Sequence, residues 1–365
     1  MKFFVKKNTF RKKYLPVFLS FAVVLAVFHA CLGMQGHQPA LFREPGVKVN
    51  SVKLHGQDLL TFERNGKPDR VFAVSVGDGG LGLRVLTATG VTWFDSSGKK
   101  LREILFAKTK DHFPIIAANL IPGQTHFLGF HHLENALSVY DAAGRFLFQV
   151  PASGGSGFPM AALEEGRGIL VKDGRGKGVH LYDHGGTYLR NILSGGYLTS
   201  FRTLPRPELN REDLIFYNYP HGKKRGYFQI ASLDGTLLDG WECKPGWSGF
   251  NFMTFEGQTA IVGNPEQAFV CVDLKGKTVA EFDAPHADYF RYVYATPLTE
   301  EYRVFLASGS GYRPYHMICV YDAGKNLIYQ EINHGHARAL RVPDSSRPEF
   351  FVAVENRIRR YALTP

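Results

Sequence analysis

The residues best suited to chemistry in this sequence are histidines that gather in short stretches. His334 and His336 flank a single glycine, His131 and His132 are adjacent, and His286 lies between these pairs in the sequence. Neutral imidazole is the commonest metal ligand among protein side chains. We therefore consider His286, His334 and His336 as a transition-metal site, which requires the fold to bring the three side chains together.

Cationic and aromatic side chains occur close to the same histidines. A guanidinium group forms two parallel hydrogen bonds with a carboxylate or a phosphate, and an aromatic face suits a sugar ring. These residues therefore predict a surface that binds an anionic glycan or a phosphorylated headgroup. The predicted ligand-binding set is His131, His132, His221, Trp247, Arg313, Tyr315 and His316.

Both sets have a simpler interpretation. Loops are polar and often contain histidine, and imidazoles spread around a rim would not meet one metal ion. The cations would then belong to a solvated rim that only keeps the protein soluble. The acidic residues do not pair convincingly in the sequence, so spacing nominates no catalytic residue.

The elements that must position these side chains are repeated hairpins. Residues 137–150, LSVYDAAGRFLFQV, alternate apolar and polar side chains, break at Asp and Gly, and alternate again. Alternation with a period of two is typical of half-buried strands, and Asp and Gly tolerate tight turns. Related segments start at Val91, Val179, Phe228, Phe269 and Ile318, with a fainter copy at Val52.

The spacing of these hairpins predicts the fold class. Their turn glycines, which lie 41 to 49 residues apart, are Gly56, Gly98, Gly144, Gly186, Gly235, Gly276 and Gly324. A repeat of this length is typical of propeller blades with four strands each. We therefore predict an all-β fold, a seven-bladed β-propeller over residues 50–365, with an N-terminal strand that completes the last blade. Eight blades stay possible if the two ends form separate sheets, and the split of the last blade stays open.

In propellers of this kind, the loops between blades and the loops between the second and third strands lie on one face, here called the loop face. The histidines concentrate in these loops, which predicts one face for both candidate sites. The histidines assigned to the loop face are His112, His131, His132, His221, His286, His316, His334 and His336.

Two segments resemble known propeller repeats. Residues 137–147, LSVYDAAGRFL, are similar to the hairpin between the third and fourth strands of the pyrroloquinoline-quinone-type, NHL and related families. Residues 347–352, RPEFFV, resemble a strand of FG-GAP-type blades. The resemblance implies a bacterial propeller fold. The sequence lacks a repeated Trp-Asp, the Asp-x-Asp-x-Asp-Gly calcium loop and a regular Trp motif, so no family activity carries over.

The first 33 residues read as an export signal or membrane anchor, and residues 34–49 as a tether. Six lysines and arginines within residues 2–13 precede an apolar run at 14–31, as in export signals. Phe28, His29, Ala30 and Cys31 resemble a bacterial lipobox, which implies lipidation of Cys31. An uncleaved anchor and a secreted form cut near Gly33 are the alternatives. These six basic residues account for six of the ten net positive charges, so the net charge does not indicate nucleic-acid binding.

These observations predict two functions outside the cytoplasm, in the bacterial periplasm or outer envelope. The first is a non-enzymatic, membrane-tethered scaffold that needs no cofactor. It would recognise a partner protein or an anionic envelope ligand, and it resembles envelope propeller lipoproteins. The second is a metal-dependent lyase or hydrolase acting on an acidic polysaccharide. His286, His334 and His336 would hold the metal, and Arg313 would clamp a carboxylate.

Overall fold

The computed structural model divides the chain into two units, Met1–Val47 and Lys48–Pro365. It describes residues 53–364 except at 77–81, 96–97, 107–111, 132–133, 153–159, 164–167, 174–175, 195, 207–208, 210, 220–224, 248, 267, 285–289, 310–313 and 343–347. The predicted export signal, Cys31 and the tether lie outside the described residues. Across the described ranges, no helix has the length and apolar character needed to span a membrane.

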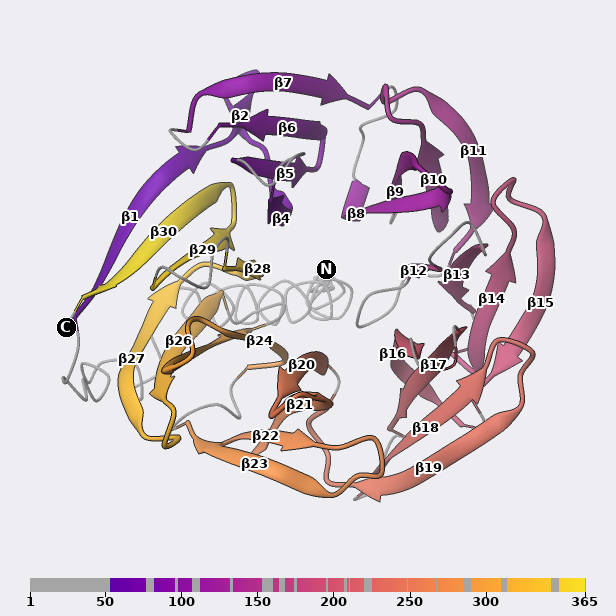
Figure 1. Cartoon of the computed structure of the whole chain (residues 1–365). Coiled ribbons are helices and arrows are strands. Elements are labelled where there is room, and N and C mark those ends of the chain that lie inside the picture. Colours follow the sequence, from indigo (N-terminus) through magenta and orange to yellow (C-terminus); the bar gives the residue numbers. More distant parts are fainter. Residues whose placement is uncertain are drawn as a thin grey trace, which may run out of the picture. The chain divides into compact units, whose positions relative to one another are not determined.

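Seven four-stranded antiparallel sheets, called blades 1 to 7 here, follow one another around a ring (Figure 1). Blade 1 comprises β4 (Val71–Val76), β5 (Leu83–Thr87), β6 (Gly90–Phe94) and β7 (Lys100–Leu105). Blade 2 comprises β8 (His112–Ile121), β9 (Gln124–His131), β10 (Ala136–Tyr140) and β11 (Phe146–Pro151). Blade 3 comprises β12 (Met160–Leu163), β13 (Gly168–Lys172), β14 (Gly178–Tyr182) and β15 (Tyr188–Leu193). Blade 4 comprises β16 (Leu198–Arg206), β17 (Arg211–Asn218), β18 (Gly226–Ser232) and β19 (Leu237–Cys243).

The remaining blades complete the predicted all-β, seven-bladed β-propeller. Blade 5 comprises β20 (Asn251–Phe255), β21 (Gln258–Glu266), β22 (Ala268–Val272) and β23 (Thr278–Asp283). Blade 6 comprises β24 (Tyr292–Pro297), β25 (Tyr302–Ser308), β26 (Tyr315–Asp322) and β27 (Leu327–His334). Blade 7 comprises β28 (Ala337–Arg341), β29 (Glu349–Val354), β30 (Arg357–Thr364) and β1 (Lys53–Thr61). A short hairpin joins β2 (Glu63–Arg64) to β3 (Lys67–Pro68).

The core lies between neighbouring blades, because each blade presents both faces to a neighbour. Leu128 and Val139 of blade 2 pack in one cluster with Ile169 and Val171 of blade 3. The middle strands β6, β10 and β13 are therefore buried along their whole length. The outer strands β7 and β15 leave most of their side chains in solvent.

Blade 7 closes the ring with one N-terminal strand and three C-terminal strands. β1 is the outer strand and pairs antiparallel with β30, from Lys53 opposite Thr364 to Thr61 opposite Arg357. The prediction that the N-terminus completes the last blade is confirmed, and the split is one strand to three. Closure removes exposed sheet edges that would otherwise pair with other chains.

The faint first repeat is a single strand, so its prediction as a hairpin around Gly56 is wrong. Gly56 lies in the middle of β1, opposite Tyr361. A Cβ atom at Gly56 would come within 2.8 Å of the Tyr361 ring. The glycine therefore makes room for a neighbouring aromatic ring and does not form a turn.

The Asp-Gly hairpin turns agree with the sequence pattern in five blades and differ in the sixth. Gly144 has a positive φ of 77°, and its N–H donates to the Asp141 carbonyl at 2.9 Å. In blade 6 the equivalent donor, at 3.1 Å from the Asp322 carbonyl, is Lys325, whose φ is 69°. In both turns the residue with a positive φ lies three positions after the aspartate. In blade 6 that residue is Lys325, and Gly324 lies one position before it.

Candidate functional site

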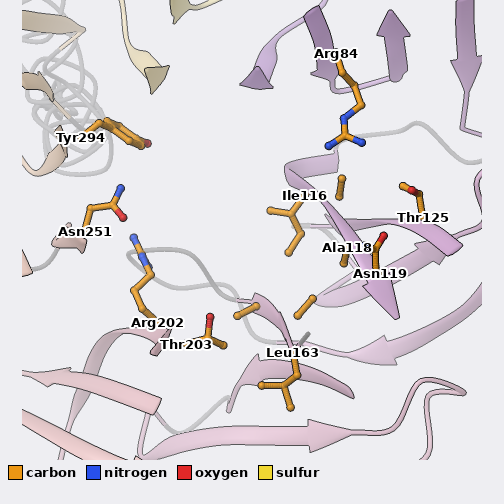
Figure 2. A pocket seen from close by; sticks show the side chains of 13 residues that line it. Arg84, Ile116, Ala118, Asn119, Thr125, Leu163, Arg202, Thr203, Asn251 and Tyr294 are labelled. Carbon is orange, nitrogen blue, oxygen red and sulfur yellow. The ribbon is translucent and has the colours of Figure 1, made fainter. Parts of the chain in front are cut away.

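A cavity of about 750 Å³ lies within the ring and is lined by residues of blades 1 to 6. Most of the lining comes from the first strands of blades 2 to 6, each of which is an edge strand of its sheet. Figure 2 shows the lining side chains converging from different blades. They are Arg84, Ile116, Ala117, Ala118, Asn119, Thr125, Ala161, Ala162, Leu163, Arg202, Thr203, Asn251 and Tyr294.

Small side chains on two neighbouring blades leave this space open. β8 contributes Ala117 and Ala118, and β12 contributes Ala161 and Ala162. These alanines are half-buried, because they contact the inter-blade core as well as the cavity. Together with neighbouring aliphatic side chains, they make this side of the cavity mainly apolar, and Asn119 and Thr125 of blade 2 are its polar members.

Arg202 is the central cation of the opposite side. One of its nitrogens, Nη1, donates to the Phe201 carbonyl at 2.9 Å. Its guanidinium carbon lies 5.4 Å from the centre of the Phe250 ring, a distance typical of a cation–π contact. Burial lowers the pKa of Arg202, but a guanidinium stays protonated in proteins. These contacts hold a permanent positive charge at the cavity wall.

Tyr294 and Asn251 add hydrogen-bond donors beside Arg202 (Figure 2). Burial raises the pKa of Tyr294 to about 12, against the opposing effect of Arg202. Its hydroxyl is therefore protonated at neutral pH. The Oδ1 atom of Asn251 accepts the Phe252 N–H at 3.0 Å, so the amide nitrogen is the group that can serve a ligand.

Arg84 directs a second guanidinium into the cavity from another side (Figure 2). Its Nε atom donates to the Ser75 hydroxyl at 3.0 Å, which ties β5 to the first strand of blade 1. Among the described residues that line the cavity, none is an aspartate or a glutamate. The local field is therefore positive and favours an anion.

Three residues of the predicted ligand-binding set are buried, namely His131, His316 and Trp247. His316 is fully buried, with Nδ1 2.8 Å from the Gly335 carbonyl oxygen, and burial lowers its pKa to about 4. Trp247 is also buried, and its ring meets Phe228 edge-on at 5.5 Å. Both side chains therefore make contacts within the protein interior.

The described histidines of the predicted sites make separate contacts. His131 is buried, with Nε2 3.9 Å from a Glu134 oxygen. His334 is exposed and its ring packs edge-on against Tyr315, with centroids 5.5 Å apart. His336 is half-buried, and its Nδ1 lies 3.2 Å from the Gly309 carbonyl oxygen.

No group of three His, Cys, Asp or Glu side chains is placed to hold a metal within the described part of the chain. His132, His221, His286 and Arg313 lie outside that part. The metal site includes His286, so it stays a prediction, as does the ligand-binding set.

The sequence interpretation missed the cavity residues. One local signal was available in residues 198–204, LTSFRTL, where Arg202 is a charged residue in a predicted inner strand, next to Phe201. A charge in such a strand is costly unless it faces a polar space. The pairing of Arg202 with Asn251 and Tyr294 has no local signal, since these residues belong to three blades.

Comparison with solved structures supports the fold. A streptogramin B lyase structure aligns with a TM-score of 0.59 and 14% identity, over 85% of this chain and 98% of the other. Virginiamycin B lyase from Staphylococcus aureus, solved with quinupristin, aligns with a TM-score of 0.58 and 12% identity, over 86% and 100%. Hydrazine synthase from Kuenenia stuttgartiensis aligns with a TM-score of 0.54 and 13% identity, over 80% and 94%.

No protein-family model matches the sequence, and no curated protein matches it either. At these low identities the structural likeness establishes the fold alone. The fold and the cavity thus define a seven-bladed β-propeller with a cationic central cavity.

Proposed function

We propose that this protein is a non-enzymatic binding propeller that recognises an anionic ligand in its central cavity. The observation that carries this proposal is the placement of Arg84 and Arg202 in a cavity whose described lining contains no carboxylate. The volume of about 750 Å³ lies within the range of about 300–1,000 Å³ that is typical of small-ligand sites.

The chemistry of the lining favours binding over proton transfer. General acid–base catalysis works best with a group whose pKa lies near the operating pH. Arg84 and Arg202 are permanent cations, and burial raises the pKa of Tyr294 to about 12. The described lining therefore offers fixed charge and hydrogen-bond donors, which suit recognition of an anion.

Titration calorimetry on the full chain in neutral-lipid nanodiscs tests this proposal. The probes are acetate, octanoate, inorganic phosphate and galacturonate. Arg202→Met should weaken binding of the best anion at least about tenfold, because a hydrogen bond to a charged group contributes about 1.5–3 kcal/mol. Arg190→Met, which removes an exposed arginine on the outer strand β15, is the matched control. Equal affinities for the two variants would refute the site.

The loop face is a second proposed binding surface, for a partner protein or an anionic envelope ligand. The exposed His334 ring and Tyr315 form an aromatic pair there, which is the observation in its favour. The metal-dependent lyase or hydrolase remains the alternative function, and it depends on His286 joining His334 and His336.

We also propose that the propeller acts outside the cytoplasm and is tethered to the membrane through residues 1–33. The apolar run and Cys31 support this proposal. Fractionation and mass spectrometry of the N-terminus test it. A lipid on Cys31 supports the lipoprotein, whereas full-length protein in the soluble cytoplasmic fraction contradicts the tether.

A further inference from the structure

We propose that the ligand of the central cavity is an amphipathic anion, with its acidic group beside Arg202 and its apolar body against β8 and β12. This inference rests on the proposed function and specifies the class of ligand. A ring of blades can leave central space whatever its sequence. The inference therefore rests on which side chains line the cavity and on where they lie.

The lining is sorted by blade. The mainly apolar side comes from blades 2 and 3. Their contributions are Ile116, Ala117, Ala118, Ala161, Ala162 and Leu163, with Asn119 and Thr125 of blade 2 as polar members. The donor-rich side comes from blades 4 to 6, whose contributions are Arg202, Thr203, Asn251 and Tyr294. Figure 2 shows Arg202, Asn251 and Tyr294 across the cavity from Ile116 and Ala118.

The donor-rich side fits a group that only accepts hydrogen bonds. Arg202 can offer N–H groups, Asn251 its amide nitrogen and Tyr294 a protonated hydroxyl. Ionised carboxylates and phosphates accept hydrogen bonds and carry a negative charge that complements the guanidinium of Arg202. Because the three groups come from separate blades, they can surround an acidic group from several directions.

The apolar side requires a ligand with more than an acidic group. A small ion such as acetate would leave the alanines and Ile116 in contact with water. An aliphatic or aromatic body would displace that water, and each buried methylene tightens binding about fourfold. The four alanine side chains there are short, so the cavity has room for such a body next to the cations.

Calorimetry with ligands matched in charge and length tests the inference on the full chain in neutral-lipid nanodiscs. The ligands are octanoate, octyl phosphate, acetate, inorganic phosphate and octanol, with empty nanodiscs as the partition control. We expect octanoate or octyl phosphate to bind at least about 30-fold more tightly than its short counterpart, since several methylenes become buried. The stronger of the two long ligands distinguishes a carboxylate from a phosphate.

Two variants separate the acidic group from the apolar body. Arg202→Met should weaken both long anions at least about tenfold and leave octanol unchanged. Ala161→Leu fills the apolar side and should weaken the long anions about tenfold while leaving the short ones unchanged. If Ala161→Leu does not fold, Ala118→Val tests the same side with a smaller change.

The outcomes distinguish failure of the amphipathic ligand from failure of the anion site. Long and short anions of equal affinity would overturn the amphipathic ligand and keep the anion site. Octanol binding as tightly as octanoate would overturn the anion site, because charge would then contribute nothing. No binding by any of the five ligands would overturn both.

Discussion

The Nδ1 atom of His316 lies 2.8 Å from the carbonyl oxygen of Gly335, which joins the start of β26 to the residue that follows β27. His316 is fully buried, and burial lowers its pKa to about 4. The neutral ring therefore donates Nδ1–H to Gly335. In the structure this histidine holds the end of a hairpin at the loop face.

This contact predicts a loss of stability in mild acid. The pKa of His316 falls from its ordinary value of 6.5 to about 4 in the fold, so the unfolded chain takes up the proton first as pH falls. The stabilising contribution is complete above pH 6.5 and is lost towards pH 4, by about 3 kcal/mol. Urea unfolding between pH 4 and pH 8 measures it.

His316→Asn is the informative variant, because an asparagine amide can keep the donor to Gly335 without titrating. We expect it to flatten the dependence of the unfolding free energy on pH. His55→Asn, which replaces an exposed histidine in β1, is the control for the substitution itself. An unaltered slope in His316→Asn would contradict the assignment.

The turn of blade 2 predicts a strongly destabilising substitution. Gly144 has a φ of 77°, and an added Cβ would lie 2.5 Å from the Leu105 carbonyl oxygen of blade 1. Gly144→Ala therefore combines backbone strain with a clash, and should cost about 2 kcal/mol or more. Gly235→Ala is the matched control, because Gly235 has a φ of 96° and nothing within 4 Å of the added Cβ. Equal losses in urea unfolding would show that the contact between blades is unimportant.

Ring closure predicts a local effect at Gly56. A side chain there must displace the Tyr361 ring, which stacks on Phe350 with centroids 5.0 Å apart. Gly56→Val should cost about 1–3 kcal/mol, as overpacking does, and loosen β1 first. Hydrogen exchange should be faster in β1 than in the wild type, with the exposed Gln57→Ala as the control. Faster exchange spread evenly over all blades would argue against a local opening.

The metal-dependent alternative predicts that the purified protein contains a transition metal. If His286, His334 and His336 bind a transition metal, untagged protein should contain about one equivalent by elemental mass spectrometry. His334→Ala together with His336→Ala should release it, since an imidazole ligand must be present to bind. His55→Ala, in β1 of blade 7, is the control. Metal-free wild-type protein that binds none on addition would remove the lyase or hydrolase from consideration.

The sequence by itself determined the blades. A hairpin such as β10–β11 is local, since strand alternation and the Asp-Gly turn lie within about 15 residues. The repeat of that unit predicts a ring of seven blades. The same local pattern wrongly predicted turn glycines at Gly56 and Gly324. Gly56 makes room for the Tyr361 ring, and Gly324 lies one position before Lys325, the turn residue with a positive φ.

Tertiary structure alone decided which side chains meet. β1 pairs with β30 across nearly the whole domain, and Arg202, Asn251 and Tyr294 reach one cavity from three blades. Burial of His316 and Trp247 likewise depends on neighbouring strands and blades. Alternation in a sequence shows which side of a strand is apolar. The closed ring determines whether that side faces a neighbouring blade, the solvent or the central cavity.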